Sequence, residues 1–538
     1  MEEAAVIQEA ASLVTLPPEL LHQILVLIYP ADVVGLPRVC RRLRAFVSQN
    51  VTLYHDVYLH HLDPPPKSSN IDWIKAVEDV VKLEKVCNRK EAEDKLDELD
   101  FVYDTATTLL RRASPLDKIA PNCRSHWASC NAGLLNELFT AQSNVDAFLS
   151  RSFLFERARR EHHQSIRYDR ARFEEYQKSA HLHCLYGKPI LNIGRLRSNK
   201  TYAYACSKVY DLRQYTPNTH WGPFRADGSN RVDWEKVEAI LITLSYNLHT
   251  KRLMTGDIKE VWDNPFAGSW SRSFASTSTG RPQTAPSSLE LQDPYGVTGT
   301  WLQIVCFLDY NDFFAFNFPT ADLIAEDAPR QPINVGEAVR LISMHLEVTA
   351  VEPPGPEDGQ DLPVVHLKGT TRSLDDSWDD NANSETRGTV RLTKDGEVWW
   401  TLFSIFHGEE RWRSECVQIG GPKSARGAAG NWFDRDYPPH GPAGPTSFWK
   451  VSDEHLPRKA MRNIMPHHFI LTYNHILHEE DISDDEGPGE MDVLGYDEDD
   501  DDDDLDMDPV EDDELPGLLT DAQKEIEDVI PNHHQGSS

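Results

Sequence analysis

Long hydrophobic runs are missing from this chain of 538 residues. Its longest apolar stretch, Leu20 to Tyr29, is interrupted by His22 and Gln23 and is shorter than the about 20 residues that a membrane-spanning helix needs. The first residues, MEEAAVIQEAASLV, are acidic, whereas signal and transit peptides carry positive charge ahead of an apolar segment. We therefore expect a protein of the cytoplasm, the nucleus or both, with no membrane as a partner.

Closely spaced cysteine pairs are also absent. The eight cysteines are scattered, so we expect reduced, buried thiols and no disulfide framework. His181, His183 and Cys184 are residue types that bind metals, but no second Cys/His pair stands at the spacing of a zinc site. The chain also lacks a glycine-rich phosphate loop and a cysteine with an evident partner base. We predict no metal, no cofactor and no catalytic residue.

Positive charge is scarce, with 54 Lys and Arg against 87 Asp and Glu and a formal net charge of −33. Proteins bind nucleic acids and anionic lipids through clustered Lys and Arg, so this balance argues against both kinds of partner. The excess is local, because residues 479–538 hold 26 acids and one base. The remaining residues are close to neutral.

The acidic segment 479–538 is poor in apolar side chains and repels itself, which predicts a disordered tail. Between Glu479 and Glu514 it contains 22 acids and no Lys or Arg. Ser483 precedes three acids and fits the pattern of acidophilic kinases, which makes it a candidate phosphorylation site. The tail either keeps the chain soluble or attracts a basic partner.

Residues 16–60 have the pattern of a small helical unit with many apolar side chains. Apolar residues recur at three- and four-residue spacing between Leu20 and Ile28, after two prolines that suit a first helical turn. A second helix is expected from Asp32, as its N-cap, to Val47. Units this small bury only about 60% of their unfolded surface, so the pattern indicates a partner for the apolar face.

Three motifs of this unit, LPPELLHQIL from Leu16, PADVV from Pro30 and VCRRL from Val39, together resemble an F-box. In that family the helices insert an apolar face into the Skp adaptor of a cullin-RING ubiquitin ligase. The resemblance therefore implies the Skp adaptor and, through it, a cullin as partners. The alternative is a helical hairpin that packs on the chain itself. The resemblance carries the contact role onto Leu16, Pro17, Leu20, Ile24, Leu25, Leu36, Val39 and Leu43.

The rest of the chain divides by composition into a helical and a β-rich part. The first contains charged, amphipathic patterns, and the second contains strand-like runs and 11 of the 13 Trp. Within the second part we expect a helix at 233–248 and a hairpin turn at 393–397. The fold class is α+β. The expected segments are a disordered N-terminus at 1–15, the F-box at 16–62, a helical linker domain at 63–181, a mainly antiparallel β domain at 182–478 and the acidic tail at 479–538.

Several blocks of the β-rich part are similar to those of a large group of filamentous-fungal F-box proteins. They are DPYGVTGTW from Asp293, CFLDYND from Cys306 and GEERWRSE from Gly408. Trp399 stands where that group would have Arg. The group has no assigned substrate, so the resemblance implies an architecture and leaves the client unknown.

The β-rich part also contains residue types that dominate protein-binding surfaces, namely Trp and Arg on a rigid scaffold. Each Trp could equally belong to the β core. The candidate client-binding residues are Arg411, Trp412, Arg413, Trp432, Asp434, Arg435 and His440.

The acids Glu409, Glu410 and Glu415 among these aromatics could instead serve a glycosidase. Strand alternation, however, would place Glu409, Glu415 and the arginines 411 and 413 on one face, as a neutral ladder of two acids and two bases. We therefore prefer a structural role for this set.

These observations predict a non-catalytic substrate receptor of a Skp–cullin–F-box ubiquitin ligase, whose β domain binds a protein client. An alternative is a non-degradative scaffold that holds a basic nuclear partner through the β domain and the acidic tail. A third reading, a carbohydrate-binding or carbohydrate-active protein, depends only on the Trp-rich composition.

Overall fold

The computed structural model describes residues 13–66, 70–114, 129–159, 168–274, 287–319, 330–374, 383–436, 441–457 and 461. These residues all belong to the compact unit Met1–Glu479. The acidic segment 479–538 with Ser483, the first twelve residues and His440 lie outside the described residues.

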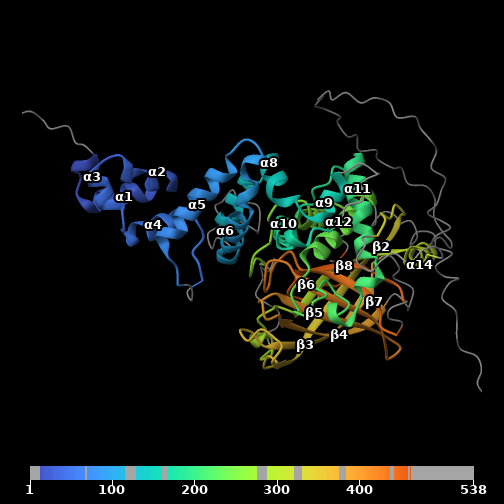
Figure 1. The fold of residues 1–538 in the computed structure, drawn as a ribbon. Coiled ribbons are helices and arrows are strands. Elements are labelled where there is room, and N and C mark those ends of the chain that lie inside the picture. Colours follow the sequence, from blue (N-terminus) through green and yellow to red (C-terminus); the bar gives the residue numbers. More distant parts are fainter. Residues whose placement is uncertain are drawn as a thin grey trace, which may run out of the picture. The chain divides into compact units, whose positions relative to one another are not determined.

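The N-terminal region is helical, as predicted, but its second predicted helix is divided. Asp32 is not an N-cap, because α2 already begins at Pro30. A 3-10 turn at Leu36–Arg38 follows α2 around Pro37, which lacks the N–H that a continuing α-helix would use, and the chain becomes extended at Cys40. Helix α3 then begins after Cys40, whose Sγ accepts a hydrogen bond from the Leu43 N–H. The elements are a 3-10 turn at Leu13–Thr15, α1 Pro18–Leu27, α2 Pro30–Gly35, α3 Arg41–Val47 and α4 Val51–His61 (Figure 1).

The helices that follow extend further along the chain than predicted. The helix expected at 233–248 is present as α12, and the Asp233 side chain caps it by accepting a hydrogen bond from the Lys236 N–H. Helices continue to Trp262, and the first strand begins only at Gly299, so the segment from 182 is not β-rich at its start. The bounds are α5 Trp73–Cys87, α6 Leu99–Arg112, α7 Cys130–Leu138, α8 Gln142–Asn144, α9 Phe153–Arg159, α10 Phe173–Tyr186, α11 Leu196–Val209, α12 Trp234–Thr250, α13 Gly256–Trp262 and α14 Tyr310–Asn317.

The strands form a closed antiparallel barrel in which each strand pairs with its neighbours in sequence and β8 pairs with β1. The expected turn at 393–397 joins β4 to β5. Closure leaves no strand edge unpaired. The bounds are β1 Gly299–Leu308, β2 Glu337–Glu352, β3 Val364–Ser373, β4 Asn383–Leu392, β5 Val398–Phe406, β6 Glu409–Gln418, β7 Ala428–Asp434 and β8 Ala443–Ser452.

Aromatic side chains fill the barrel. The Trp301 ring lies 5.2 Å from the Trp400 ring and 5.8 Å from the Phe448 ring, and the last two are 5.4 Å apart. Because β5 lies opposite β1 and β8 in the strand order, these contacts cross the interior. An eight-stranded barrel is just wide enough for side chains to fill in this way.

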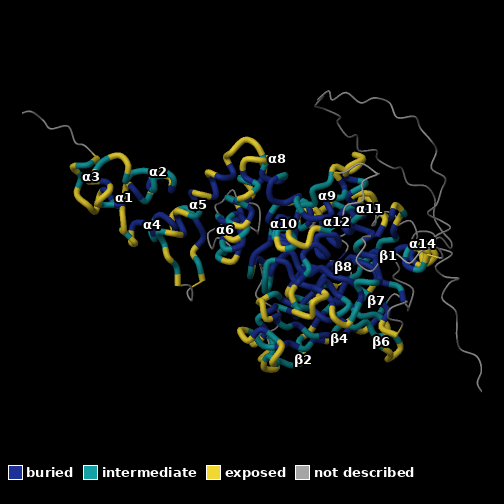
Figure 2. The backbone as a smooth tube through the Cα atoms, in the orientation of Figure 1, coloured by how far each residue is buried: buried dark blue, intermediate teal, exposed yellow. Residues whose placement is uncertain are grey.

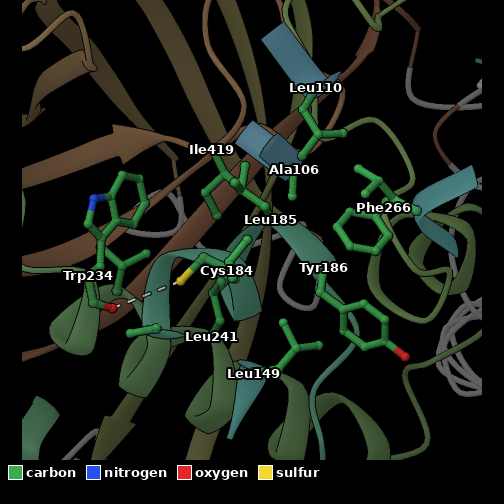
Figure 3. Close-up of a cluster of buried hydrophobic side chains, with 14 of the residues drawn as sticks. Ala106, Leu110, Leu149, Cys184, Leu185, Tyr186, Trp234, Leu241, Phe266 and Ile419 are labelled. Atoms are coloured by element: carbon green, nitrogen blue, oxygen red, sulfur yellow. Dashed lines mark hydrogen bonds between the residues drawn. The ribbon is translucent and has the colours of Figure 1, made fainter. Parts of the chain in front are cut away.

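The outside of the barrel packs on the helices through one continuous hydrophobic cluster. Cys184 of α10 belongs to this cluster, and its Sγ lies 4.0 Å from the Trp234 carbonyl oxygen of α12. Figure 3 shows side chains from α6, α10, α12 and the chain after β6 meeting there. The labelled residues are Ala106, Leu110, Leu149, Cys184, Leu185, Tyr186, Trp234, Leu241, Phe266 and Ile419. The observed fold is therefore α+β, as expected.

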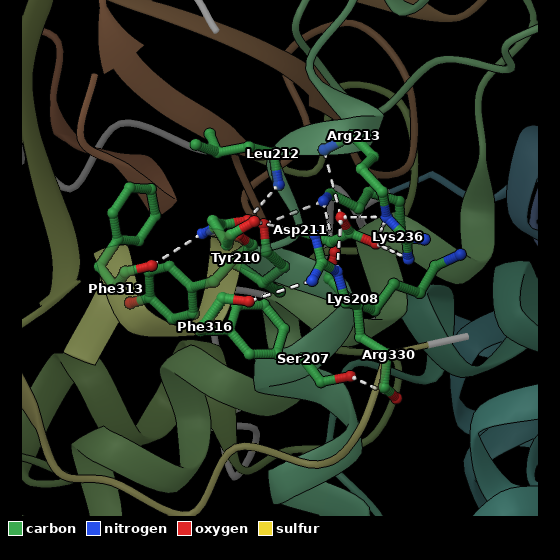
Figure 4. Close-up of polar contacts among 12 residues, drawn as sticks. Ser207, Lys208, Tyr210, Asp211, Leu212, Arg213, Lys236, Phe313, Phe316 and Arg330 are labelled. Atoms are coloured by element: carbon green, nitrogen blue, oxygen red, sulfur yellow. Dashed lines mark hydrogen bonds and ion pairs between the residues drawn. The ribbon is translucent and has the colours of Figure 1, made fainter. Parts of the chain in front are cut away.

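A polar network ties the end of α11 to the segment between β1 and β2 (Figure 4). The Asn317 side chain of α14 donates to the Tyr210 carbonyl and accepts from the Leu212 N–H, each at 3.0 Å. The buried Asp211 carboxylate contacts Arg213 at 2.7 Å and Arg330 at 3.5 Å. These charged contacts hold the pKa of Asp211 below its usual value although burial opposes them.

Candidate protein-binding surfaces

Exposed apolar side chains concentrate in the N-terminal helices. Eight of the thirteen large hydrophobic side chains that are exposed among the described residues lie between residues 13 and 60. Figure 2 shows exposed residues along α1 and α3 in this region. The eight side chains are Leu13, Leu20, Ile24, Leu27, Tyr29, Val39, Val51 and Leu59. Scattered single apolar residues are ordinary on surfaces, whereas a concentration of this kind marks an interaction site.

The predicted adaptor contacts divide between surface and interior. Leu20, Ile24 and Val39 are 48%, 39% and 70% exposed. Pro17 is exposed, and Leu16 and Leu36 are half-buried. Leu25 and Leu43 are only 1% and 3% exposed, so they pack the helices against each other beneath the exposed face.

Leu27 was missed by the sequence reasoning, although it is 66% exposed. It follows Ile24 by three residues and Leu20 by seven, which is the spacing of one helical face. The same spacing puts Leu21 and Leu25 together on a second face of α1, which is buried. The signal for an outward apolar stripe was therefore present in the sequence.

Basic side chains flank this apolar face. Arg38, Arg41, Arg42 and Arg44 are all exposed. The Arg42 guanidinium donates to the Leu16 carbonyl at 3.3 Å, which places it beside the start of α1. The face is therefore suited to a partner with apolar contacts and acidic residues around them.

Two buried carboxylates join the N-terminal helices to the helices that follow. Tyr29 donates a hydrogen bond to Glu84 of α5, and this bond with a carboxylate raises the pKa of Tyr29 to about 12. The Asp63 carboxylate is fully buried and accepts hydrogen bonds from the backbone N–H groups of Ser114 at 3.1 Å and Cys130 at 2.8 Å. It also accepts the Ser129 hydroxyl. The N-terminal unit is thus anchored by contacts that are costly to break.

Five of the seven candidate client-binding residues gather where β6 begins and β7 ends. The Trp412 and Trp432 rings are 5.3 Å apart and nearly perpendicular, and the Arg411 guanidinium lies 4.8 Å over the Trp412 ring. Trp412 pairs with Asp434 across the two strands. The Arg435 N–H donates to the Arg411 carbonyl at 3.0 Å. Both Trp side chains are half-exposed, while Arg411 and Arg435 are exposed.

Arg413 has different surroundings from the other candidates. It forms an ion pair with Glu415, which is fully buried and also accepts a hydrogen bond from the Thr401 hydroxyl at 2.8 Å. The guanidinium lies 5.4 Å from the rings of both Trp221 and Phe403. Burial raises the pKa of Glu415, and the Arg413 charge opposes this rise. Arg413 therefore holds the segment before α12 against the barrel.

The acids considered for glycosidase chemistry are engaged in ion pairs or exposed separately. Glu410 pairs with both Arg387 and Arg435, Glu415 is enclosed beneath Arg413, and Glu409 is exposed. The alternation expected for this strand fails at its start, because a bulge opposite Ser404 and Ile405 shifts the register.

The histidines considered as metal ligands have structural partners. His181 stacks on Trp234 with ring centroids 3.6 Å apart, and His183 Nδ1 lies 2.7 Å from a Glu238 carboxylate oxygen. Within the described ranges, no group of three or more His, Cys, Asp or Glu side chains is placed to hold a metal ion. Of the seven described cysteines, all of them free thiols, five are buried. None of the described helices has the length and apolar character to cross a membrane.

Residues 13–60 match the F-box-like family model, and this match spans the four helices that carry the exposed apolar face. No curated protein and no solved structure matches the chain. The similarity of the barrel to fungal F-box proteins therefore stays a prediction. F-box proteins are generally non-catalytic adaptors. The N-terminal region is an F-box-like domain, which supports an F-box protein and implies binding of the Skp adaptor of a cullin-based ubiquitin ligase.

Proposed function

We propose that this chain is the non-catalytic substrate-recognition subunit of a Skp–cullin–F-box ubiquitin ligase in the cytoplasm or nucleus. The F-box-like face binds the Skp adaptor, and the barrel binds a protein client. The observation that carries the proposal is the concentration of exposed apolar side chains within the residues that match the family. The other subunits of the ligase then supply the chemistry, and this chain holds client lysines near the ubiquitin donor.

The free energy for adaptor binding is available in the exposed stripe of α1 and in Val39, which follows the 3-10 turn before α3. Leu20, Ile24, Leu27 and Val39 have between 39% and 70% of their surfaces exposed. Fully burying such a side chain contributes about 1.5–3 kcal/mol, so burying the exposed fractions contributes about 1 kcal/mol each. Together the four side chains contribute about 4 kcal/mol, which is half of the roughly 8 kcal/mol that corresponds to a micromolar dissociation constant.

Charge reversal of the stripe tests the adaptor contact. Leu20→Asp with Ile24→Asp would place two unpaired carboxylates in the interface, so adaptor binding should fall by at least about 100-fold. Leu291→Asp is the matched control, since Leu291 is 74% exposed and lies outside the F-box-like region. Co-purification with the adaptor and cullin is measured beside circular dichroism of each variant. Full retention of both subunits by the folded double variant would overturn the proposal.

The Trp412–Trp432 pair with Arg411 supports the barrel as the client-binding part. Trp and Arg are the residue types most enriched in binding hot spots, and here they are half-exposed and in mutual contact. Arg411→Glu and Trp412→Ala should each release the client and leave the adaptor bound. Affinity purification with mass spectrometry under brief proteasome inhibition identifies the client as a protein that is lost from these variants. If both variants keep the same co-purified proteins as the wild type, the barrel end is not the client site.

The scaffold alternative is favoured only by the run of 22 acids between Glu479 and Glu514, which would suit a basic nuclear partner. Client stability separates the two functions. A client of a receptor accumulates when the cullin is inactivated, whereas a partner of a scaffold keeps its normal level.

A further inference from the structure

One end of the α11–α12 helix pair presents basic residues without acidic neighbours in sequence. Residues 188–207 and 239–256 contain no Asp or Glu, in a chain whose formal net charge is −33. The two segments supply the basic residues Lys188, Arg195, Arg197, Lys200, His249, Lys251 and Arg252.

Packing of the two helices brings these segments together. The Tyr202 ring of α11 stacks on the Tyr246 ring of α12, with centroids 3.8 Å apart. One turn away, the Tyr246 hydroxyl donates to the Asn199 side-chain oxygen at 3.4 Å. The beginning of α11 therefore lies beside the end of α12, and the cations of both ends share one surface, which we call the α11–α12 basic end.

The cations of this surface face solvent and lack acidic partners. Arg195, Arg197, Lys251 and Arg252 are exposed. Within the part of the chain that the structure describes, none of these four forms an ion pair with a carboxylate. The Asp263 carboxylate lies near the α11–α12 basic end, but it already forms an ion pair with Lys188, whose Nζ is 3.2 Å from Asp263 Oδ1.

Helix stability does not explain these positions. Cations stabilise the C-terminal end of a helix, which suits Lys251 and Arg252 at the end of α12. Arg195 and Arg197 stand instead at the N-terminal end of α11, where the positive end of the helix dipole repels them. No side chain caps the first turn of α11. An anionic group bound here would relieve the repulsion and accept hydrogen bonds from the free backbone N–H groups.

An open hollow with a mixed polar and aliphatic lining adjoins the cations. Its volume is about 550 Å³, and Leu191, Asn192, Ile193, Arg195 and His249 line it. Ile193 is 40% exposed at this hollow, and the neighbouring Leu196 is 70% exposed. The surface thus combines fixed positive charge with a place for an apolar side chain.

We propose that the α11–α12 basic end binds an acidic peptide segment of a partner protein, with carboxylates on the cations and an apolar side chain in the hollow. The large negative charge of the whole chain opposes long polyanions such as nucleic acids. The exposed apolar side chains here are aliphatic, whereas single-stranded nucleic acids bind to aromatic side chains on which bases stack. This surface is separate from the F-box-like face and the barrel end, so the proposal does not rest on the proposed function.

Fluorescence anisotropy with the full chain tests the proposal. The probe is the fluorescein-labelled peptide GEEDLEEDLEEG. Arg195→Glu with Arg197→Glu should weaken binding at least about tenfold, or about 1.4 kcal/mol. Lys75→Glu with Lys85→Glu is the matched control, because it makes the same charge change at exposed positions of α5. The control should bind within about twofold of the wild type.

Three further measurements test which chemical groups the surface binds. Lys251→Glu with Arg252→Glu should weaken binding as well, which guards against a folding defect at the start of α11. A probe with Gly in place of both Leu should bind more weakly, and oligouridylate of equal charge should compete poorly. Equal binding by the wild type and both folded charge variants would overturn the proposal. Equal binding of the Gly probe would overturn the role of the hollow, and strong competition by the oligonucleotide would overturn the choice of a peptide.

Discussion

Acid is expected to weaken this fold through one buried histidine, His181 of α10. Its ring is stacked 3.6 Å from the Trp234 ring at 5° from parallel, and its Nδ1 lies 2.9 Å from the Tyr103 hydroxyl. Burial lowers the pKa of His181 to about 3, and the nearby Arg111 charge acts in the same direction. The imidazole is therefore neutral in the folded chain at neutral pH.

The sign of the effect follows from comparing the folded and unfolded chains. In the unfolded chain His181 takes up a proton below pH 6.5, whereas in the folded chain it does so only near pH 3. The stabilising contribution is thus fully present above pH 6.5 and is lost as the pH falls toward 3. Each pH unit in this window removes about 1.4 kcal/mol, so lowering the pH from 7 to 5 costs about 2 kcal/mol.

His181→Phe isolates this contribution, because phenylalanine keeps a flat ring against Trp234 and cannot be protonated. Urea unfolding, followed by circular dichroism at pH 7 and pH 5, gives the loss of unfolding free energy for each chain. The wild type should lose about 2 kcal/mol more than His181→Phe over this step. His60→Gln, at an exposed position of α4, should behave as the wild type. Equal losses for the wild type and His181→Phe would refute the reasoning.

Four other substitutions separate packing from binding. Leu25→Ala should lower the unfolding free energy by about 2–5 kcal/mol, measured by urea unfolding. Leu27→Ala should change the unfolding free energy by less than about 0.5 kcal/mol and should instead weaken adaptor binding in a pull-down. Equal behaviour of the two variants in both assays would contradict this division. Trp400→Ala, inside the barrel, should cost about 3–5 kcal/mol in the same unfolding assay. Asp63→Ala should increase protease cleavage between α4 and α7 in limited proteolysis, because backbone N–H groups and a hydroxyl lose their acceptor; an unchanged cleavage pattern would argue against this anchor.

Short sequence patterns were sufficient to predict elements that form through contacts between residues close together in the chain. Asp233 caps α12 through the Lys236 N–H, three residues along the chain, and the turn at 393–397 joins two adjacent strands. The F-box-like region was found because three short motifs between Leu16 and Leu43 resemble those of that family. The interruption of the α-helix near Pro37 could also have been predicted, since proline lacks the N–H of an α-helical hydrogen bond.

Features that depend on distant contacts could not be predicted in this way. The α11 sequence, LRSNKTYAYACSKV, has few large apolar residues, yet Tyr202, Cys206 and Val209 are buried against α12 and the barrel. Barrel closure depends on the pairing of β1 with β8, whose residues are more than a hundred positions apart. Arg411 and Arg413 were expected on one face, but the bulge beside Ser404 separates their surroundings.

One client could bind both the α11–α12 basic end and the barrel end around Trp412 and Trp432, and its affinity would then depend on the two surfaces together. Two sites on one chain that bind one client act together, because the second contact forms at a high effective concentration. Losing either site would then reduce affinity by as much as about 100-fold, and losing the second site would cost far less. If the two sites bound separate partners, each partner would lose affinity only for the variant that changes its own site.

A mutant cycle distinguishes these arrangements. It compares Trp412→Ala, Arg195→Glu with Arg197→Glu, and all three substitutions together, using the client identified from the barrel variants. Strong non-additivity of the two changes would place both surfaces on one client, since sites without shared partners add within about 0.5 kcal/mol. Additive losses would exclude cooperation between the sites, and no loss from the arginine variant would assign the α11–α12 basic end to another acidic partner.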